Sequence, residues 1–106
     1  MEGFEATTSS ADGVATVVLE GELDIASAPV LDASLADVEG NGTGTVVLDL
    51  SGVRFIDSTG LRSLLSARQR AETAGRTLRL TNVPVDVERV FDVTGVRRIF
   101  DIASPA

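Results

Sequence analysis

The side chains best suited to chemistry gather in one short stretch, Asp57-Ser58-Thr59-Gly60, which precedes a helical pattern. Asp, Ser and Thr favour helix N-caps, because their oxygens accept hydrogen bonds from free N–H groups of the first turn. One such residue is enough, and here three stand in a row. Capping is the simplest interpretation of this stretch. It is compatible with a modified hydroxyl, since a helix N-terminus also stabilises a phosphate.

Two other carboxylates follow predicted strands. Asp49 ends an apolar run, as the phosphoacceptor of a response regulator does, but that chemistry also needs a lysine, and the chain has none. We therefore expect Asp49 to accept hydrogen bonds from loop backbone at the strand end. Asp24 is expected to be a solvated loop carboxylate. Phe55 and Ile56 are expected in the core, where they would anchor the loop before Asp57.

The missing residue types exclude most kinds of catalysis. The chain has no Cys and no His, and its nine basic residues are all Arg. Thiol nucleophiles, Ser-His-Asp triads, Cys or His metal sites, Schiff bases and Walker-type phosphate loops are therefore absent. We expect no metal and no cofactor. An enzyme built on Asp24, Asp49 and Asp57 would need a cleft that so small a domain rarely provides, so we expect no enzymatic activity.

Charge and hydropathy narrow the choice of partners. The formal net charge is −7, and the arginines are scattered rather than gathered on one element. Nucleic-acid binders need a basic face to neutralise phosphates, so neither nucleic acid nor an anionic membrane is expected as a partner. The start of the chain lacks the pattern of a signal peptide, and no apolar run approaches the ~18 residues of a membrane span. We expect a cytoplasmic protein.

The first part of the chain predicts a hairpin and a helix. Residues 3–8 and 14–21 have strand patterns, joined by the hairpin turn Asp12-Gly13. A helix is expected to begin at Ser27, as its cap, with Pro29 in the first turn.

The second part alternates strands with helices. Thr45–Leu50 is almost continuously apolar, which is typical of a central parallel strand. Beyond it we expect a helix from Asp57 to Gly75, a strand at Thr77–Thr81, a helix from Pro84 to Gly95 and a strand at Arg98–Ile102. The order ββαβαβαβ predicts an α/β fold in a single domain, residues 1–106, with a mixed, mostly parallel sheet of four to five strands and three to four helices.

This topology predicts where a site would lie. In open α/β sheets, binding sites lie beyond the carboxyl ends of the parallel strands. Three connections meet that description: Glu22–Ala28, Ser51–Thr59 and Asn82–Pro84. They bring Asp24 to the same end of the sheet as the Asp57-Ser58-Thr59-Gly60 stretch.

The segment from Val53 to Leu61, preceded by Val46–Ser51, resembles a STAS domain, and specifically a bacterial anti-sigma-factor antagonist. An Asp-Ser-Thr-Gly-Leu element after an apolar strand is specific to that family. Three flanking segments are also similar to it, so that the resemblance extends from about Gly13 to Ile102: Gly21–Asp24, Gly75–Leu80 and Val90–Gly95.

The resemblance implies a regulatory function. In that family an anti-sigma factor, itself a serine kinase, phosphorylates the serine after the aspartate, which here is Ser58, with Thr59 as second choice. The unphosphorylated antagonist binds the anti-sigma factor, and a PP2C-type phosphatase resets it. The implied partner-binding face comprises the residues Asp24, Asp57, Ser58, Thr59, Gly60 and Arg62.

Two features depart from the family pattern. Arg62 stands where many members have a second glycine, which would place a guanidinium close enough to pair with a phosphate. We expect the last helix common in the family to be missing or very short, because only Ala103–Ala106 follow Ile102. A constitutive STAS subunit of a sensory or lipid-transport assembly, in which Ser58 would be only a cap, remains the alternative function.

Overall fold

The computed structural model describes residues 3–103, which form five strands, three α-helices and one 3-10 helix. Along the chain these are β1 (Glu5–Ala11), β2 (Val14–Leu23), α1 (Ala28–Glu39), β3 (Thr45–Ile56), α2 (Ser58–Ala74), β4 (Thr77–Thr81), α3 (Val85–Thr94), η1 (Arg97–Ile99) and β5 (Asp101–Ile102). This order confirms the predicted alternation of strands and helices.

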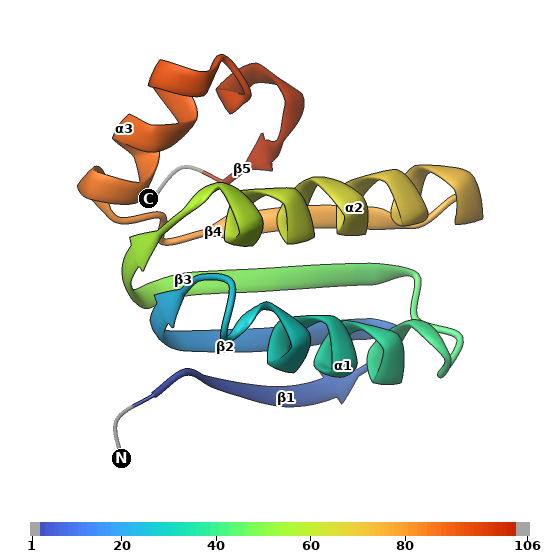
Figure 1. Ribbon diagram of the computed structural model, residues 1–106. Coiled ribbons are helices and arrows are strands. Elements are labelled where there is room, and N and C mark those ends of the chain that lie inside the picture. Colours follow the sequence, from blue (N-terminus) through green and yellow to red (C-terminus); the bar gives the residue numbers. More distant parts are fainter. Residues whose placement is uncertain (1–2, 104–106) are drawn as a thin grey trace.

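The five strands form one sheet in their order along the chain, from β1 to β5. β1 pairs with β2 antiparallel, and the other neighbouring pairs are parallel. Each parallel crossover moves one strand in the same direction, so right-handed connections place α1 and α2 side by side on one face of the sheet (Figure 1). The predicted α/β class and mostly parallel sheet are confirmed.

The turn between β1 and β2 has the backbone that its sequence predicts. Asp12 and Gly13 have φ values of 56° and 79°, which is the left-handed pair that a two-residue type I′ hairpin requires. The seven residues of β1 pair with β2 from Ala11↔Val14 to Glu5↔Glu20. The turn therefore sets the register of the antiparallel edge.

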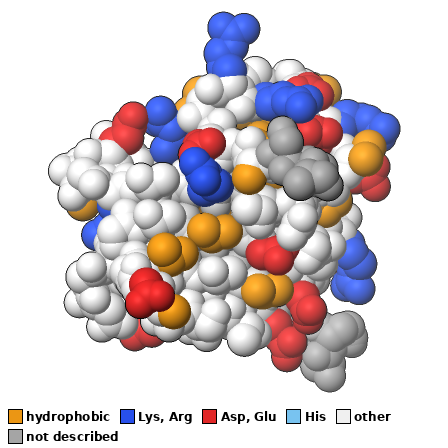
Figure 2. Space-filling view, turned by 180° about the vertical axis from the view of Figure 1, so that it is seen from behind, with side chains coloured by type: hydrophobic (Ala, Val, Ile, Leu, Met, Phe, Trp, Pro, Cys, Tyr) orange, Lys and Arg blue, Asp and Glu red, His pale blue; other side chains and the backbone are white. Residues whose placement is uncertain are grey.

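The core lies between the sheet and the helices. Alternate residues of β2 and β3, such as Val17 and Leu48, are fully buried and share one cluster with Leu31 of α1 and Leu64 of α2. The opposite face of the sheet keeps partial exposure at residues such as Val47. Viewed from behind, the molecule presents hydrophobic side chains in small groups among polar ones (Figure 2).

Strand β3 is longer than its sequence predicts. The apolar run ends at Leu50, and Ser51–Thr59 was expected to be a loop, but the strand continues to Ile56. Its pairing with β2 shifts register twice, between Val18 and Glu20 and between Gly21 and Glu22 of β2. Each shift is a β-bulge that reverses the alternation of buried and exposed residues, so the extension lacks the simple period of a strand.

The end of the chain also differs from the prediction. Arg98–Ile102 was expected to be one strand, but Arg97–Ile99 forms the 3-10 helix η1 and only Asp101–Ile102 pairs with β4. The ring of Phe100 packs against Phe91 of α3, with 5.3 Å between ring centroids. A last helix does not occur up to Ala103, and residues 104–106 lie outside the described part of the chain.

Candidate functional site

The carboxyl ends of β2 and β3 meet the N-terminus of α2. The backbone N–H of Asp57 donates to the carbonyl of Leu23, the last residue of β2, at 3.1 Å. The N–H of Leu61 donates to the Asp57 carbonyl at 2.9 Å, which closes the first turn of α2. The predicted site therefore begins where two strands fix the start of a helix.

Asp57 is the residue that caps α2. It has extended backbone angles, and its Oδ1 accepts a hydrogen bond from the N–H of Gly60 at 2.9 Å. Its Oδ2 accepts from the N–H of Ile25 at 3.3 Å. One carboxylate thus caps the helix and joins it to the β2–α1 loop, which confirms the capping interpretation for Asp57.

Ser58, the first residue of α2, is exposed, whereas Thr59 is half-buried. Because Asp57 supplies the cap, the Ser58 hydroxyl is not needed for that task. Within residues 3–103 it forms no side-chain hydrogen bond. The hydroxyl is therefore presented to solvent at the positive end of a helix dipole.

Gly60 has a steric role that explains its place in the stretch. It is buried, and a Cβ built on it would collide with the carbonyl oxygen of Leu23 and lie 2.8 Å from the Cγ of the same residue. Only glycine lets α2 approach β2 this closely. The four-residue stretch thus combines a cap, a free hydroxyl and a close helix–strand contact.

Asp24 lies in the loop that Asp57 holds. Its Oδ1 accepts hydrogen bonds from the backbone N–H groups of Ala26 and Ser27, both at 3.0 Å, and lies 3.1 Å from the Ser27 hydroxyl oxygen. The expectation of a merely solvated carboxylate is wrong, because Asp24 is half-buried and holds the turn before α1. The loop of Asp24 and the cap of α2 are connected through Ile25.

Ser27 differs from the predicted cap. It stands at the N-cap position of α1, but its side chain makes no cap hydrogen bond. Its hydroxyl donates to the carbonyl of Glu22 at 2.6 Å instead, and the residue is 7% exposed. Ser27 therefore serves the loop between β2 and α1, a role that the local sequence does not reveal.

Arg62 lies one turn after Ser58 on α2 and is exposed. In the part of the chain that the structure describes, it forms no ion pair. Together with Thr59 it lines a shallow hollow between α1 and α2. A helix spacing of four residues brings Arg62 to the same face as Ser58.

Phe55 was expected in the core, and this is wrong: the residue is 50% exposed, whereas Ile56 is 4% exposed. The second bulge of β3 is the physical reason. Gly21 of β2 pairs with Val53, but the next residue of β2, Glu22, pairs with Phe55. The extra residue, Arg54, turns Phe55 outward and gives the inward position to Ile56.

Asp49 accepts a backbone hydrogen bond, as the sequence predicts, but it does so inside β3 rather than from a loop, because the strand continues to Ile56. Its Oδ1 accepts a hydrogen bond from the backbone N–H of Ser51 at 2.9 Å. Partial burial raises the pKa of the Asp49 carboxyl, but hydrogen bonds from Ser51 and the side chain of Asn82 outweigh burial and lower the pKa below its ordinary value. Asp49 is therefore bonded to the backbone of β3 itself, whereas Asp57 is bonded to the start of α2 and to the β2–α1 loop.

Comparison with known proteins agrees with this geometry. Residues 5–105 match the STAS domain family. The chain is 34% identical, over 83% of its length and 80% of the relative, to the anti-sigma-B factor antagonist of Bacillus subtilis (strain 168). Within residues 3–103, no helix has the length and apolar character needed to cross a membrane.

Solved structures show the same fold. An anti-sigma factor antagonist from Mycobacterium paratuberculosis superposes with a TM-score of 0.87 at 24% identity, over 97% of this chain and 87% of that one. The antagonist SpoIIAA superposes in its unphosphorylated form with a TM-score of 0.74 (16% identity, 96% and 90% coverage). Its phosphorylated form from Bacillus gives 0.72 (20% identity, 94% and 92% coverage). The chain belongs to the STAS domain family and, within it, is related to the anti-sigma-factor antagonists.

Proposed function

We propose that this protein is an anti-sigma-factor antagonist controlled by phosphorylation of Ser58. Unphosphorylated, it binds an anti-sigma factor that is a serine kinase, and after phosphorylation it releases that partner. The observation that carries the proposal is the exposed Ser58 at the start of α2, beside an aspartate that already caps the helix. The 34% identical relative, named an anti-sigma-B factor antagonist, supports the choice of partner.

Ser58 is a better acceptor than Thr59 because it is exposed, whereas Thr59 is half-buried. In the reaction, the Ser58 hydroxyl oxygen attacks the γ-phosphorus of ATP, its proton passes to a base of the kinase, and ADP leaves. The kinase supplies the magnesium, the base and the nucleotide site. The antagonist needs only to present the oxygen.

The added phosphate is tolerated inside the domain. It carries about −1.5 to −2 charges at neutral pH. The N-terminus of α2 offsets its repulsion from Asp57 by roughly 0.3–1 kcal/mol, and Arg62, one turn further along the helix, adds an ion-pair partner. The hydrogen bonds that fix the start of α2 come from Asp57 rather than from the modified hydroxyl. We therefore expect no large conformational change.

At a protein interface the same charge is unfavourable. One like-charge pair about 6 Å apart, at an effective dielectric constant of about 20, costs on the order of 3 kcal/mol, or about a hundredfold in affinity. Removing water from the dianion adds to this cost. Electrostatic repulsion and desolvation thus suffice to release the partner without a change of fold.

The remaining elements of the proposal follow from this role. Residues 1–106 act as one domain without enzymatic activity of its own, in the cytoplasm, where sigma factors act. A PP2C-type phosphatase removes the phosphate and restores binding. Neither nucleic acid nor membrane is a partner, in keeping with the net charge of −7.

Phosphorylation of the purified protein by a serine-kinase anti-sigma factor from the source organism, with ATP and mass spectrometry, tests the acceptor. We expect one added phosphate on the wild-type protein and on Thr59→Ala, and none on Ser58→Ala. One phosphate on Ser58→Ala would overturn the assignment.

A further inference from the structure

The exposed ring of Phe55 is unusual in this protein. The chain has four phenylalanines, and two of the other three, Phe91 and Phe100, are buried and pack against each other. Phe55 is 50% exposed. Aromatic rings gain much free energy from leaving water, so a ring held in solvent is a candidate contact for another molecule.

The outward position of Phe55 is built into the strand pair rather than left to a loose loop. The residue lies in β3, opposite Glu22 of β2. The first bulge depends on Gly52, where a Cβ would lie 2.6 Å from the Cγ of Glu20 and 2.9 Å from the carbonyl oxygen of Leu19. Bulges next to functional sites commonly re-aim a side chain, and the second bulge does so for Phe55 relative to the buried Val53.

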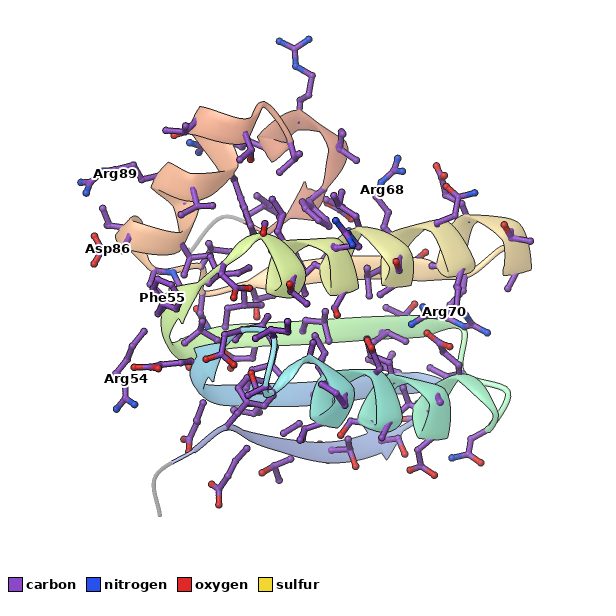
Figure 3. The ribbon with its side chains drawn as sticks, viewed as in Figure 1. Arg54, Phe55, Arg68, Arg70, Asp86 and Arg89 are labelled. Atoms are coloured by element: carbon purple, nitrogen blue, oxygen red, sulfur yellow. The ribbon has the colours of Figure 1, made fainter. Side chains whose placement is uncertain are left out.

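Two further apolar side chains accompany the ring at the same end of the sheet. Ile25, in the β2–α1 loop, is 72% exposed, and Val85, at the start of α3, is 68% exposed. We call Ile25, Phe55 and Val85 the Phe55 patch. Figure 3 shows Phe55 where β3 ends, between Asp86, the neighbour of Val85, and Arg54.

The patch adjoins Ser58. Three peptide units separate Phe55 from Ser58, so their Cα atoms are at most about 11 Å apart. Ile25 donates its N–H to Asp57, the neighbour of Ser58, at 3.3 Å. A standard interface buries about 800 Å² on each partner, which corresponds to a circle of about 16 Å radius. A partner centred on Ser58 therefore reaches Phe55 and Ile25.

We infer that the Phe55 patch is the apolar anchor for the serine-kinase anti-sigma factor, with the Phe55 ring at its centre. The inference rests on the proposed function, since it gives that partner a second contact beside Ser58. The partner would present an apolar recess to the ring. Arg54 and the Asp86–Arg89 ion pair, at 3.5 Å, supply the charged rim that surrounds the apolar centre of a typical interface.

A second copy of this chain is a poorer occupant. The net charge of −7 makes two copies repel each other. Three side chains also fall well short of the 20 to 30 residues on each side that a standard interface uses. The anti-sigma factor, in contrast, already contacts the adjoining Ser58 surface in the proposed function.

The anchor and the serine have separate effects. The patch supplies affinity that is present in both phosphorylation states, whereas the phosphate adds repulsion in one of them. Removing the ring should therefore weaken docking and leave the chemical step intact. For the kinase reaction this means a higher KM for the antagonist with an unchanged kcat, since the Ser58 hydroxyl is untouched.

The test compares Phe55→Ser with Val93→Ser in binding to a serine-kinase anti-sigma factor from the source organism that binds the wild-type protein. Val93 is a matched control because it is 81% exposed on the last turn of α3, about 12 Å along the helix from Val85. We expect Phe55→Ser to weaken binding about 30-fold, as for a central aromatic contact, and Val93→Ser to leave it unchanged. Phe55→Leu, which keeps an apolar side chain, should recover most of the affinity.

Circular dichroism and thermal melting of each variant show whether the fold is intact. Equal binding by Phe55→Ser and the wild type would overturn the inference, even if Ser58→Asp abolishes binding and so upholds the proposed function. Weak binding by Phe55→Ser together with full binding by Ser58→Asp would contradict control by charge at Ser58 and support the docking role of Phe55. If Phe55→Ser abolishes only self-association, measured by sedimentation, the anchor assignment is wrong and the patch joins two copies.

Discussion

At the scale of single residues, the site separates three tasks. Asp57 holds the start of α2 and the β2–α1 loop through its two carboxylate oxygens. Gly60 provides the space for α2 to approach Leu23. Ser58 is left exposed, with no part in either contact. Because the structural tasks belong to its neighbours, we expect the domain to stay folded if Ser58 is phosphorylated as proposed.

Gly60→Ala tests the close contact between α2 and β2. The added methyl group would collide with the Leu23 carbonyl, so either the helix or the strand must move. Overpacking of this kind costs about 1–3 kcal/mol, measured as the free energy of unfolding in urea. Gly40→Ala is the control, because its Cβ would lie at an ordinary 3.5 Å from the Ala36 carbonyl and its φ is −79°. Equal stability of the two variants would contradict the account.

Asp49 should make stability depend on pH in acid. Its pKa in the folded protein lies below the ordinary value of 3.8, because hydrogen bonds from Ser51 and Asn82 outweigh the effect of burial. A lowered pKa means that the charged form stabilises the fold above pH 3.8, and that this contribution is lost as the pH falls through the folded pKa.

Asp49→Asn removes the charge and keeps an oxygen that can accept from Ser51. We expect the variant to be less stable than the wild type at pH 7, by no more than about 1.5 kcal/mol, and the difference to shrink below pH 3.8. Unfolding curves at several pH values measure the stability difference and its change with pH. The control for loss of charge alone is Asp37→Asn, because Asp37 is an exposed residue of α1. If the stability difference between the wild type and Asp49→Asn grew as the pH falls, the lowered pKa of Asp49 would be contradicted.

At the scale of elements, the sequence predicts the strands, helices and turns that depend on local residue spacing. It does not predict features that depend on how two strands pair. The span Thr77–Thr81 and the turn at Asp12-Gly13 agree with their predictions, because each depends on local spacing or local backbone preference. Asp57-Ser58-Thr59-Gly60 was located correctly for the same reason, as a cap before a periodic helix.

The extension of β3 and the exposure of Phe55 could not be predicted in this way. Both depend on how many residues of β3 face each residue of β2, and a bulge changes that count without changing composition. The only local signals are Gly21 and Gly52, which lie at the two bulges. Likewise, the Ser27 hydroxyl donates to the carbonyl of Glu22 rather than capping α1, because the loop folds back on itself. The local sequence does not predict this fold of the loop.

At the scale of the whole molecule, one packed body of sheet and helices carries the proposed phosphorylation site. The sheet and helices α1 and α2 enclose one apolar core, and the site lies at one end of that body (Figure 1). The proposed switch places its charge on the surface of this body, where it can repel a partner without a change of fold.

The most direct measurement is the affinity of Ser58→Asp and Ser58→Asn for a serine-kinase anti-sigma factor that binds the wild-type protein, together with their melting temperatures. The two side chains have nearly the same shape, and only the first is charged. We predict that Ser58→Asp weakens binding at least tenfold, that Ser58→Asn weakens it far less, and that both melt close to the wild type. Equal binding by the two variants, or unfolding of Ser58→Asp, would contradict control of partner binding by charge at Ser58.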